Sequence, residues 1–244
     1  DSLVDFGSEL FDGKVGHNLI VAWVNRNSRT NKKMTAIRLV DYRYARRDEK
    51  ELEFFNPANR HIASTDNFVR MPGSPVAYWV SEAILRAFEN SKLGELAPTK
   101  KGLDTGENDR FLRYWFEISH SIFGIEYKTS RDFTDAKMKW APHDKGGEYR
   151  RWYGNKEWVI NWENNGCELR NTTANLRSER LYFSNAITWS SLSSGKISFR
   201  FSNYGAISNT AGSSLYPCSD TLAYFLGFLN TKVAQLLIDV ISPT

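Results

Sequence analysis

The sequence predicts an α+β fold, in which mixed and antiparallel strands are combined with a few helices. Three observations lead to this class. The first 45 residues contain apolar runs of strand length. Short segments between residues 156 and 208 also have strand character. Near the end of the chain, apolar residues recur at helical spacing over residues 222–241.

Composition limits the possible partners without selecting one. Hydrophobic content of 41% and charged content of 25% are ordinary for a globular protein, whereas 14% aromatics with eight Trp is high. Trp and Tyr suit interfaces and base stacking as well as cores. A net charge of +4 permits an anionic partner but does not require one.

No apolar run approaches the roughly 20 residues needed to cross a bilayer, so no membrane partner is expected. The chain opens on Asp1 without an initiator Met or a leader pattern, and it stops soon after a helical pattern. We therefore expect part of a longer cytoplasmic protein. Cys167 and Cys218 stand alone, which favours buried thiols over a disulfide or a zinc site.

The N-terminal part predicts two strands joined as a hairpin. Residues 19–24 form a continuous apolar run, typical of a buried strand, and residues 34–40 form a second strand. Residues 25–33 would be the long, basic connection between them.

Residues 48–97 predict a helical connector. A short helix near residues 47–55 should end at Asn56-Pro57, and Ser81 should cap a second one. The second helix would place four apolar residues on one face: Ala83, Ile84, Ala87 and Phe88. Residues 96–102 predict a linker, with the main domain boundary near residue 97.

Residues 98–244 predict a second unit. Strands are expected at 114–118, 156–163, 197–202 and 205–208. Residues 222–241 predict one long helix, with Asp220 as its N-cap.

Signatures of a self-contained active site are missing from the sequence. It contains no phosphate-binding glycine loop, no GxSxG elbow and no HExxH pair. The four His are scattered, so we expect surface or hydrogen-bonded side chains. We predict no catalytic residue, no metal site and no cofactor site within this chain.

The stretch 100–113 is the first with binding chemistry. Its two glycines permit tight turns, and four of its side chains offer donors suited to phosphate: Thr105, Asn108, Arg110 and Arg113. The alternative is a turn whose Asp and Asn cap the next element.

The stretch 139–191 is basic, aromatic and broken by glycines. Residues 137–156 hold six bases against two acids, and residues 170–204 hold five against one. Such an excess favours DNA through counterion release. Arg150 or Arg151 could read guanine, and Asn155, Asn161 or Asn164 could read adenine. The alternative is an ordinary strand-and-loop domain in which Trp158 and Trp162 are core residues.

Six segments of this chain, in order, also resemble a known family. They are residues 102–113, 139–140, 145–155, 159–164, 187–190 and 226–233. They resemble the C-terminal half of the large adenine-specific DNA methyltransferases of BREX phage-defence systems (PglX type) and, more distantly, TaqI-like type II restriction-modification enzymes. The likeness covers most of residues 70–244.

The resemblance implies a role in choosing the DNA site. Residues 1–47 would be the last strands of the methyltransferase sheet, and residues 98–244 a TaqI-like target-recognition domain, truncated at its C-terminus. The family's N/D-P-P-Y/F motif and its S-adenosylmethionine loop are not in this sequence. S-adenosylmethionine would therefore serve the parent enzyme, and this chain would be inactive alone.

Double-stranded DNA is the expected partner. Phosphate contacts would come from Lys101, Arg113, Lys145 and Arg180, and base readout from residues 150–155 and 188–191. The full expected set is Lys101, Thr105, Asn108, Arg110, Arg113, Lys139, Lys145, Arg150, Arg151, Trp152, Asn155, Arg180, Thr188, Trp189 and Ser190. The alternative is a module that docks other defence-system subunits through aromatic side chains.

Overall fold

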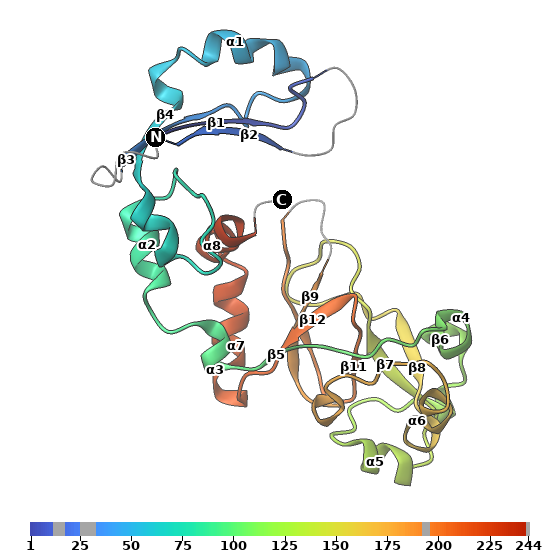
Figure 1. Cartoon of the computed structure of the whole chain (residues 1–244). Coiled ribbons are helices and arrows are strands. Elements are labelled where there is room, and N and C mark those ends of the chain that lie inside the picture. Colours follow the sequence, from blue (N-terminus) through green and yellow to red (C-terminus); the bar gives the residue numbers. More distant parts are fainter. Residues whose placement is uncertain (12–17, 25–32, 192–195, 243–244) are drawn as a thin grey trace. The chain divides into compact units, whose positions relative to one another are not determined.

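The computed structural model describes residues 1–11, 18–24, 33–191 and 196–242, and its α+β class confirms the prediction (Figure 1). The chain divides into two compact units, Asp1–Asn90 with Val240 and Ser91–Asp239. The division thus falls after Asn90, a few residues before the expected boundary. The roles assigned to residues 1–47, 48–97 and 98–244 stay predictions.

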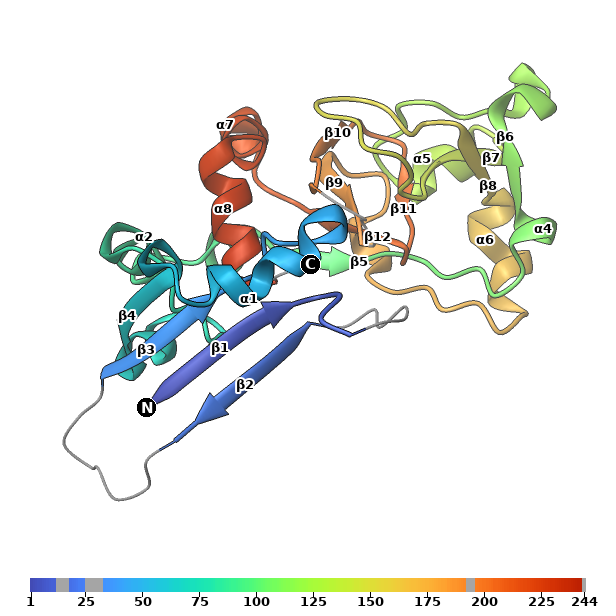
Figure 2. The same ribbon diagram turned by 90° about the horizontal axis from the view of Figure 1, so that it is seen from above.

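The first unit contains one four-stranded sheet, with the strands in the order β2-β1-β3-β4 (Figure 2). Their bounds are β1 Ser2–Gly7, β2 Leu19–Trp23, β3 Lys33–Arg38 and β4 Arg60–Ser64. β1 is antiparallel to β2 and parallel to β3, so Ser2 lies opposite both Trp23 and Thr35. The predicted β2–β3 hairpin is therefore wrong. The short β1, which the sequence pattern did not single out, separates the two strands, and residues 25–32 of the expected connection lie outside the described residues.

Alternate residues of β1 pack on opposite faces of this sheet, as strand geometry requires. Leu3 joins a cluster with Met34, Ala36 and Tyr78. Val4 joins a second cluster against which Phe54 packs, immediately after α1. Figure 1 shows α1 over one face of the sheet.

β2 does not fit the prediction of a buried strand. Ile20 is 50% exposed and Trp23 is 59% exposed. β2 lies at the edge of the sheet, outside the clusters that cover β1 and β3. A continuous apolar run therefore did not imply burial on both faces here.

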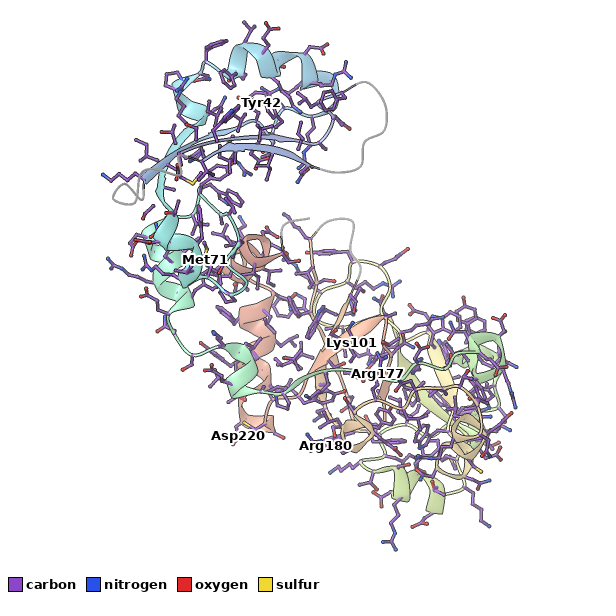
Figure 3. The ribbon with its side chains drawn as sticks, viewed as in Figure 1. Tyr42, Met71, Lys101, Arg177, Arg180 and Asp220 are labelled. Carbon is purple, nitrogen blue, oxygen red and sulfur yellow. The ribbon has the colours of Figure 1, made fainter. Side chains whose placement is uncertain are left out.

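The helices of the first unit lie close to their predicted positions. The 3₁₀ helix Tyr44–Glu49 continues into α1 Lys50–Glu53, and the chain turns at Asn56-Pro57 as expected. Tyr42, labelled in Figure 3, donates a 2.8 Å hydrogen bond to Glu53 of α1. Two further 3₁₀ helices are Pro57–Asn59 and Thr65–Arg70.

α2 Glu82–Phe88 begins after Ser81 as predicted, although the Ser81 side chain makes no capping hydrogen bond. The predicted apolar face is partly wrong. Leu85 is the buried residue, and it clusters with Met71 and Ala77. Ala83 and Ala87 are exposed, because the face that packs is centred on the one large aliphatic side chain missing from the predicted set.

The second unit contains two four-stranded sheets, ordered β10-β9-β12-β5 and β11-β7-β8-β6. The first uses β5 Thr99–Lys101, β9 Ala186–Ser190, β10 Arg200–Ser202 and β12 Gly212–Leu215. The second uses β6 Leu112–Tyr114, β7 Trp140–Asp144, β8 Trp158–Asn161 and β11 Ile207–Ser208. The strands predicted at 156–163, 197–202 and 205–208 are confirmed as β8, β10 and β11.

Two predictions for this unit are wrong. The expected linker contains β5, because Thr99 to Lys101 pair with β12. The strand expected at 114–118 ends at Tyr114, where the 3₁₀ helix Trp115–Glu117 begins. Glu117 explains this ending, since its carboxylate accepts a 2.6 Å hydrogen bond from the Tyr114 backbone N–H and folds the chain back.

The single helix predicted at 222–241 is two helices, α7 Ser219–Leu229 and α8 Lys232–Ile241, bent by 78° at the break. Asn230 sits at the break, and its amide makes two hydrogen bonds to the backbone of Phe199. The Thr231 hydroxyl then accepts from the Ala234 N–H and starts α8. Cys218 occupies the N-cap of α7, so Asp220 lies in the first turn and not at the predicted cap.

The other helices of this unit are short: α3 Leu93–Leu96, α4 Asn108–Phe111, α5 Ser130–Asp135, α6 Glu163–Arg170 and the 3₁₀ helices His120–Ile122 and Glu179–Leu181. In the described part of the chain no single helix is long and apolar enough to span a membrane. α7 and α8 reach that length and composition only as a bent pair.

Each sheet of the second unit has its own core. Trp162 is fully buried among Phe183, Tyr182 and Leu169 beside the β7–β8 sheet, which confirms its core interpretation. The β9 sheet packs its Ile187 against Phe225 of α7. The two cysteines, expected to be buried, are free and exposed, because both lie at helix positions that face solvent.

Gly102 supplies a stability test of the packing between the sheets. A Cβ at this position would lie 1.9 Å from the backbone oxygen of Ser208. Gly102→Ala should therefore lower the free energy of unfolding by about 2–3 kcal/mol, measured by urea titration with tryptophan fluorescence. Gly227→Ala is the matched control, since no atom lies within 4 Å of its added Cβ. As an alanine within α7, it should stabilise by about 0.5–1 kcal/mol. Equal effects at the two sites would contradict the packing described.

Candidate nucleic-acid interface

A 13-residue connection between β7 and β8 carries three of the exposed groups expected to bind: Arg150, Arg151 and Trp152. We call residues 145–157 the β7–β8 loop. Tyr149, Trp152 and Tyr153 on this loop are between 51% and 65% exposed. Large apolar groups in water are unfavourable, so a contiguous exposed set indicates a binding surface.

The loop is fixed to the neighbouring β9–β10 sheet by main-chain contacts. The Gly147 N–H donates to the Ser190 hydroxyl at 3.1 Å, and that hydroxyl donates back to the Gly147 carbonyl at 2.8 Å. The Trp152 N–H donates to the Phe199 carbonyl, and the Phe201 N–H donates to the Trp152 carbonyl. The loop therefore pairs with the backbone of β10 and is held against that sheet.

Trp152 adopts this position with a left-handed backbone, at φ 72. Such a conformation is unusual for a bulky residue and persists where surrounding contacts fix it. Its two main-chain hydrogen bonds supply that constraint. The indole is consequently held outward at the surface.

A buried ion pair closes the base of the loop. Lys156 Nζ lies 2.6 Å from Asp144 Oδ1, and Asp144 is 7% exposed. Lys156 also donates to the Ser202 hydroxyl at 3.0 Å, and Ser202 donates to the other Asp144 oxygen. These contacts join the end of β7, the start of β8 and β10.

Arg200 lies under the loop and is only 1% exposed. Its guanidinium donates to the hydroxyls of Ser198 and Ser190, and no carboxylate hydrogen-bonds it among the residues described. Burial lowers the pKa of Arg200 below its usual range, because the charged form loses its hydration. A buried cation without a bonded acid makes the overlying surface favourable for an anion.

Arg200 was not among the expected site residues. Its burial depends on the loop folding across β10, and no pattern local to residues 197–202 reports that contact. The alternation Phe199-Arg200-Phe201 would place the arginine on the face opposite the two rings and so predicts an exposed side chain, which is why the sequence contains no indication of its burial.

The predicted cations of the loop differ in how freely they can act. Arg150 makes a 2.8 Å ion pair with Glu157. The Lys145 ammonium lies 4.1 Å from the centre of the Trp158 ring. Arg151 packs over Tyr149, is exposed, and has no ion-pair partner within the described ranges. Arg151 is therefore the loop cation best placed to meet a phosphate or a base.

Several other predicted residues are buried and serve the fold. Asn155 is 4% exposed and donates to the Glu148 carbonyl within the loop. Thr188 is buried in β9, and Trp189 packs beside the α7 core. Asn161, considered as an adenine reader, is buried and bonds Glu168.

The stretch 100–113 makes the contacts expected of a structural turn. Thr105 is buried and donates to the Asn108 side chain at 2.6 Å. Arg110 pairs with Glu168 at 2.8 Å, and Arg113 donates to the backbone carbonyls of Asp109 and Leu112. These side chains make contacts within the protein, and the DNA contacts expected of them stay predictions.

The remaining predicted cations lie apart from the loop. Lys139 pairs with Glu163 at 2.9 Å. Lys101 on β5 and Arg180 on the 3₁₀ helix Glu179–Leu181 are exposed (Figure 3). The structure thus brings together Lys145, Arg150, Arg151, Trp152 and Ser190 of the predicted set. In the part of the chain that the structure describes, Lys101, Lys139 and Arg180 make no hydrogen bond, ion pair or ring contact with these residues.

Histidine and acidic side chains do not gather into a metal-binding group in the described ranges. His143 is buried in β7, where its Nδ1 lies 2.9 Å from the Ile207 carbonyl and its Nε2 lies 3.0 Å from the Asn209 amide nitrogen. The neutral tautomer protonated on Nδ1 satisfies both contacts.

Comparison with known proteins finds two relatives. No model of a known protein family matches the chain. The chain is 35% identical over 202 residues to "Adenine-specific methyltransferase PglX" of Lacticaseibacillus casei, covering 78% of the chain. It is 34% identical over 253 residues to "Adenine-specific methyltransferase BrxX" of Escherichia coli, covering all of the chain. The chain spans 17% and 20% of the lengths of these relatives.

His143 generates a test by pH. Burial lowers its pKa to about 4 from the usual 6.5. The unfolded chain therefore binds the proton first as pH falls, and the free energy of unfolding should drop by about 3 kcal/mol between pH 6.5 and 4. Protonation would also turn Nε2 into a donor facing the Asn209 NH₂. That amide is held in place because its oxygen accepts from Ala211.

Denaturant titrations across this pH range should show the loss in the unaltered chain and a flatter profile in His143→Gln. Parallel profiles for the two proteins would show that His143 does not carry this dependence.

Proposed function

We propose that this chain, which is homologous to part of the adenine-specific methyltransferases PglX and BrxX, binds double-stranded DNA and selects the site of methylation. The observation that carries the proposal is the β7–β8 loop. It presents Tyr149, Arg151, Trp152 and Tyr153 on a backbone that both sheets of the second unit fix. A recognition loop needs this combination of exposed chemistry and fixed geometry.

Arg151 has the leading role in this proposal. A guanidinium can bind a phosphate or read a guanine edge with two parallel hydrogen bonds. Arg150 is held by Glu157 and supports the loop in the free protein. Trp152 and Tyr153 offer planar faces for sugar or base contacts.

The buried Arg200 supports the same surface from below. It is too deep to contact DNA directly, so its contribution is to hold Ser190, and through Ser190 the Gly147 backbone. Its charge also favours a phosphate above the loop.

We assign the methyl transfer itself to parts of the whole protein that lie outside the sequence described here. We infer that the whole protein methylates adenine with S-adenosylmethionine, as the names of the relatives suggest, in a BREX phage-defence setting. Enzymes that modify a base extrude it from the duplex, which requires a separate surface that holds the site. The second unit would provide that surface, with residues 98–244 as the recognition domain.

A second function is favoured by one observation. Tyr114, Trp115 and Phe116 are exposed, and the rings of Tyr114 and Phe116 stack with centroids 5.2 Å apart. Such a patch suits a protein partner, for example another subunit of the same system. Aromatic docking depends weakly on salt, whereas phosphate binding weakens steeply as salt rises.

A duplex-binding experiment with the purified chain tests the proposal. Fluorescence anisotropy with a labelled 30-base-pair duplex should show binding at low salt and a linear fall of log affinity with log salt. Arg151→Ala should weaken binding by roughly 5–10-fold and reduce the salt slope by about 1.

Arg131→Ala is the matched control. Arg131 is an exposed arginine of α5 paired with Asp135, away from the loop. It should leave both affinity and slope unchanged. Absence of duplex binding at low salt, or equal losses in the two variants, would refute the assignment of the loop.

A further inference from the structure

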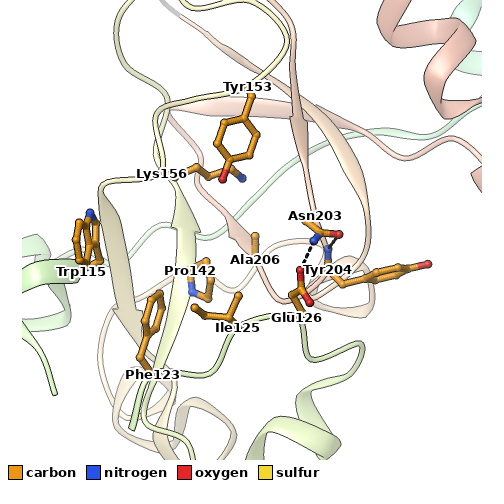
Figure 4. Close-up of a pocket in the computed structure, with 10 residues that line it drawn as sticks. All are labelled: Trp115, Phe123, Ile125, Glu126, Pro142, Tyr153, Lys156, Asn203, Tyr204 and Ala206. Carbon is orange, nitrogen blue, oxygen red and sulfur yellow. Dashed lines mark hydrogen bonds between the residues drawn. The ribbon is translucent and has the colours of Figure 1, made fainter. Parts of the chain in front are cut away.

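A pocket of about 290 Å³ opens beside the loop on the second unit (Figure 4). Four aromatic residues are among those that line it: Trp115, Phe123, Tyr153 and Tyr204. Pro142 of β7 and Ala206 lie between them. The duplex-binding role proposed above uses only Tyr153 of this group, so the pocket has no assigned occupant. Its size is below that of a drug-sized site and suits one small planar group.

One wall of the pocket is polar. The Asn203 amide donates a 2.8 Å hydrogen bond to Glu126 Oε1, and its own oxygen accepts from the Tyr204 N–H. The amide is therefore fixed, and it orients the carboxylate. Glu126 Oε2 has no hydrogen-bond partner in the described part of the chain. This oxygen is therefore available to accept a hydrogen bond, while Asn203 holds the carboxylate in place through Oε1.

The backbone at Glu126 is also constrained. Glu126 has φ 67, a left-handed conformation that costs of order 1 kcal/mol in a residue with a side chain. Gly205 makes this possible, since a Cβ there would lie 2.6 Å from the Glu126 nitrogen. The close approach of two loops thus sets the position of the carboxylate at the pocket wall.

Two lysines lie at or near the pocket. Lys156 is neutralised by Asp144 and is part of the wall. Lys128 Nζ lies 5.2 Å from the centre of the Tyr204 ring, is exposed, and has no ion-pair partner among the described residues. Lys128 thus lies over the ring of one lining residue, although Lys128 itself does not line the pocket.

We propose that this pocket receives an unpaired nucleobase, with guanine preferred, and that Lys128 meets its phosphate. The rings stack on the base, and stacking tolerates every base. Discrimination comes from Glu126, because the exposed edge of guanine carries two adjacent N–H donors that can converge on the free Glu126 Oε2. Choosing a nucleobase over an aromatic amino-acid side chain rests on the DNA-binding function proposed above.

Three DNA hairpins of one stem sequence test the proposal by anisotropy: fully paired, with one bulged guanine, and with one bulged thymine. The unaltered chain should bind the guanine bulge at least about fivefold tighter than the paired stem, as expected for stacking and edge contacts to one base. Glu126→Gln should lose the preference for guanine over thymine, since an amide nitrogen would face guanine donors. Trp115→Ala should lose the preference for either bulge.

Tyr224→Ala is the matched control, because Tyr224 is an exposed aromatic residue of α7 that does not line the pocket. It should keep the full preference, and all four proteins should bind the paired stem alike. Equal binding of the three hairpins by the unaltered chain overturns the pocket assignment. In that event binding of the paired stem still supports the duplex function, so the two failures are distinguishable.

If no hairpin binds, nucleotides alone decide the question. Guanosine monophosphate should quench tryptophan fluorescence saturably, uridine monophosphate should do so at least about fivefold more weakly, and Trp115→Ala should abolish the difference. Saturable binding of N-acetyltryptophanamide without binding of guanosine monophosphate overturns the proposal in favour of a peptide site.

Discussion

The buried pair between Asp144 and Lys156 is the contact on which the binding surface depends. It joins the last residue of β7 to the residue two before β8, so it closes the base of a 13-residue loop. Because the ion pair holds the two ends of the loop together, each further contact made by the loop costs less conformational entropy. Ser202, on the adjoining sheet, donates a hydrogen bond to the second carboxylate oxygen of Asp144.

A buried ion pair by itself is weak evidence of stability, since desolvation offsets much of its attraction. Here the ion pair matters because it fixes the positions of the groups around it. An apolar pair of similar volume could fill the same space, but it would not hold Ser202 and the start of β8 in a fixed register. The carboxylate also lies near the buried Arg200 guanidinium and lessens the cost of that second charge. Asp144 and Arg200 are thus buried next to the partly exposed Lys156, beneath a surface that faces solvent.

The loop and the pocket share this support. Tyr153 and Lys156 belong to the loop and also line the pocket, and Asn203 follows β10 directly. A ligand in the pocket would therefore contact the same backbone that presents Arg151 and Trp152. In the proposed function, the duplex contacts and the capture of an unpaired base would both depend on the same backbone. The residues between the two sites are fixed by hydrogen bonds to two sheets.

The sequence by itself determined the α+β class, the homology with adenine-specific methyltransferases, the positions of several strands and the stretch that carries the loop. These follow from residue type and local periodicity, which act over a few positions.

Tertiary structure decided which arginines are free. Arg110 and Arg113 looked like DNA contacts but are bonded to Glu168 and to the backbone. Arg200 gave no signal and lies buried under the loop. β1 separated the expected hairpin, and Asn230 broke the expected long helix by bonding Phe199, 31 residues away. Each of these outcomes depends on a partner distant in sequence, and a local pattern contains no information about which distant group will occupy the neighbouring space.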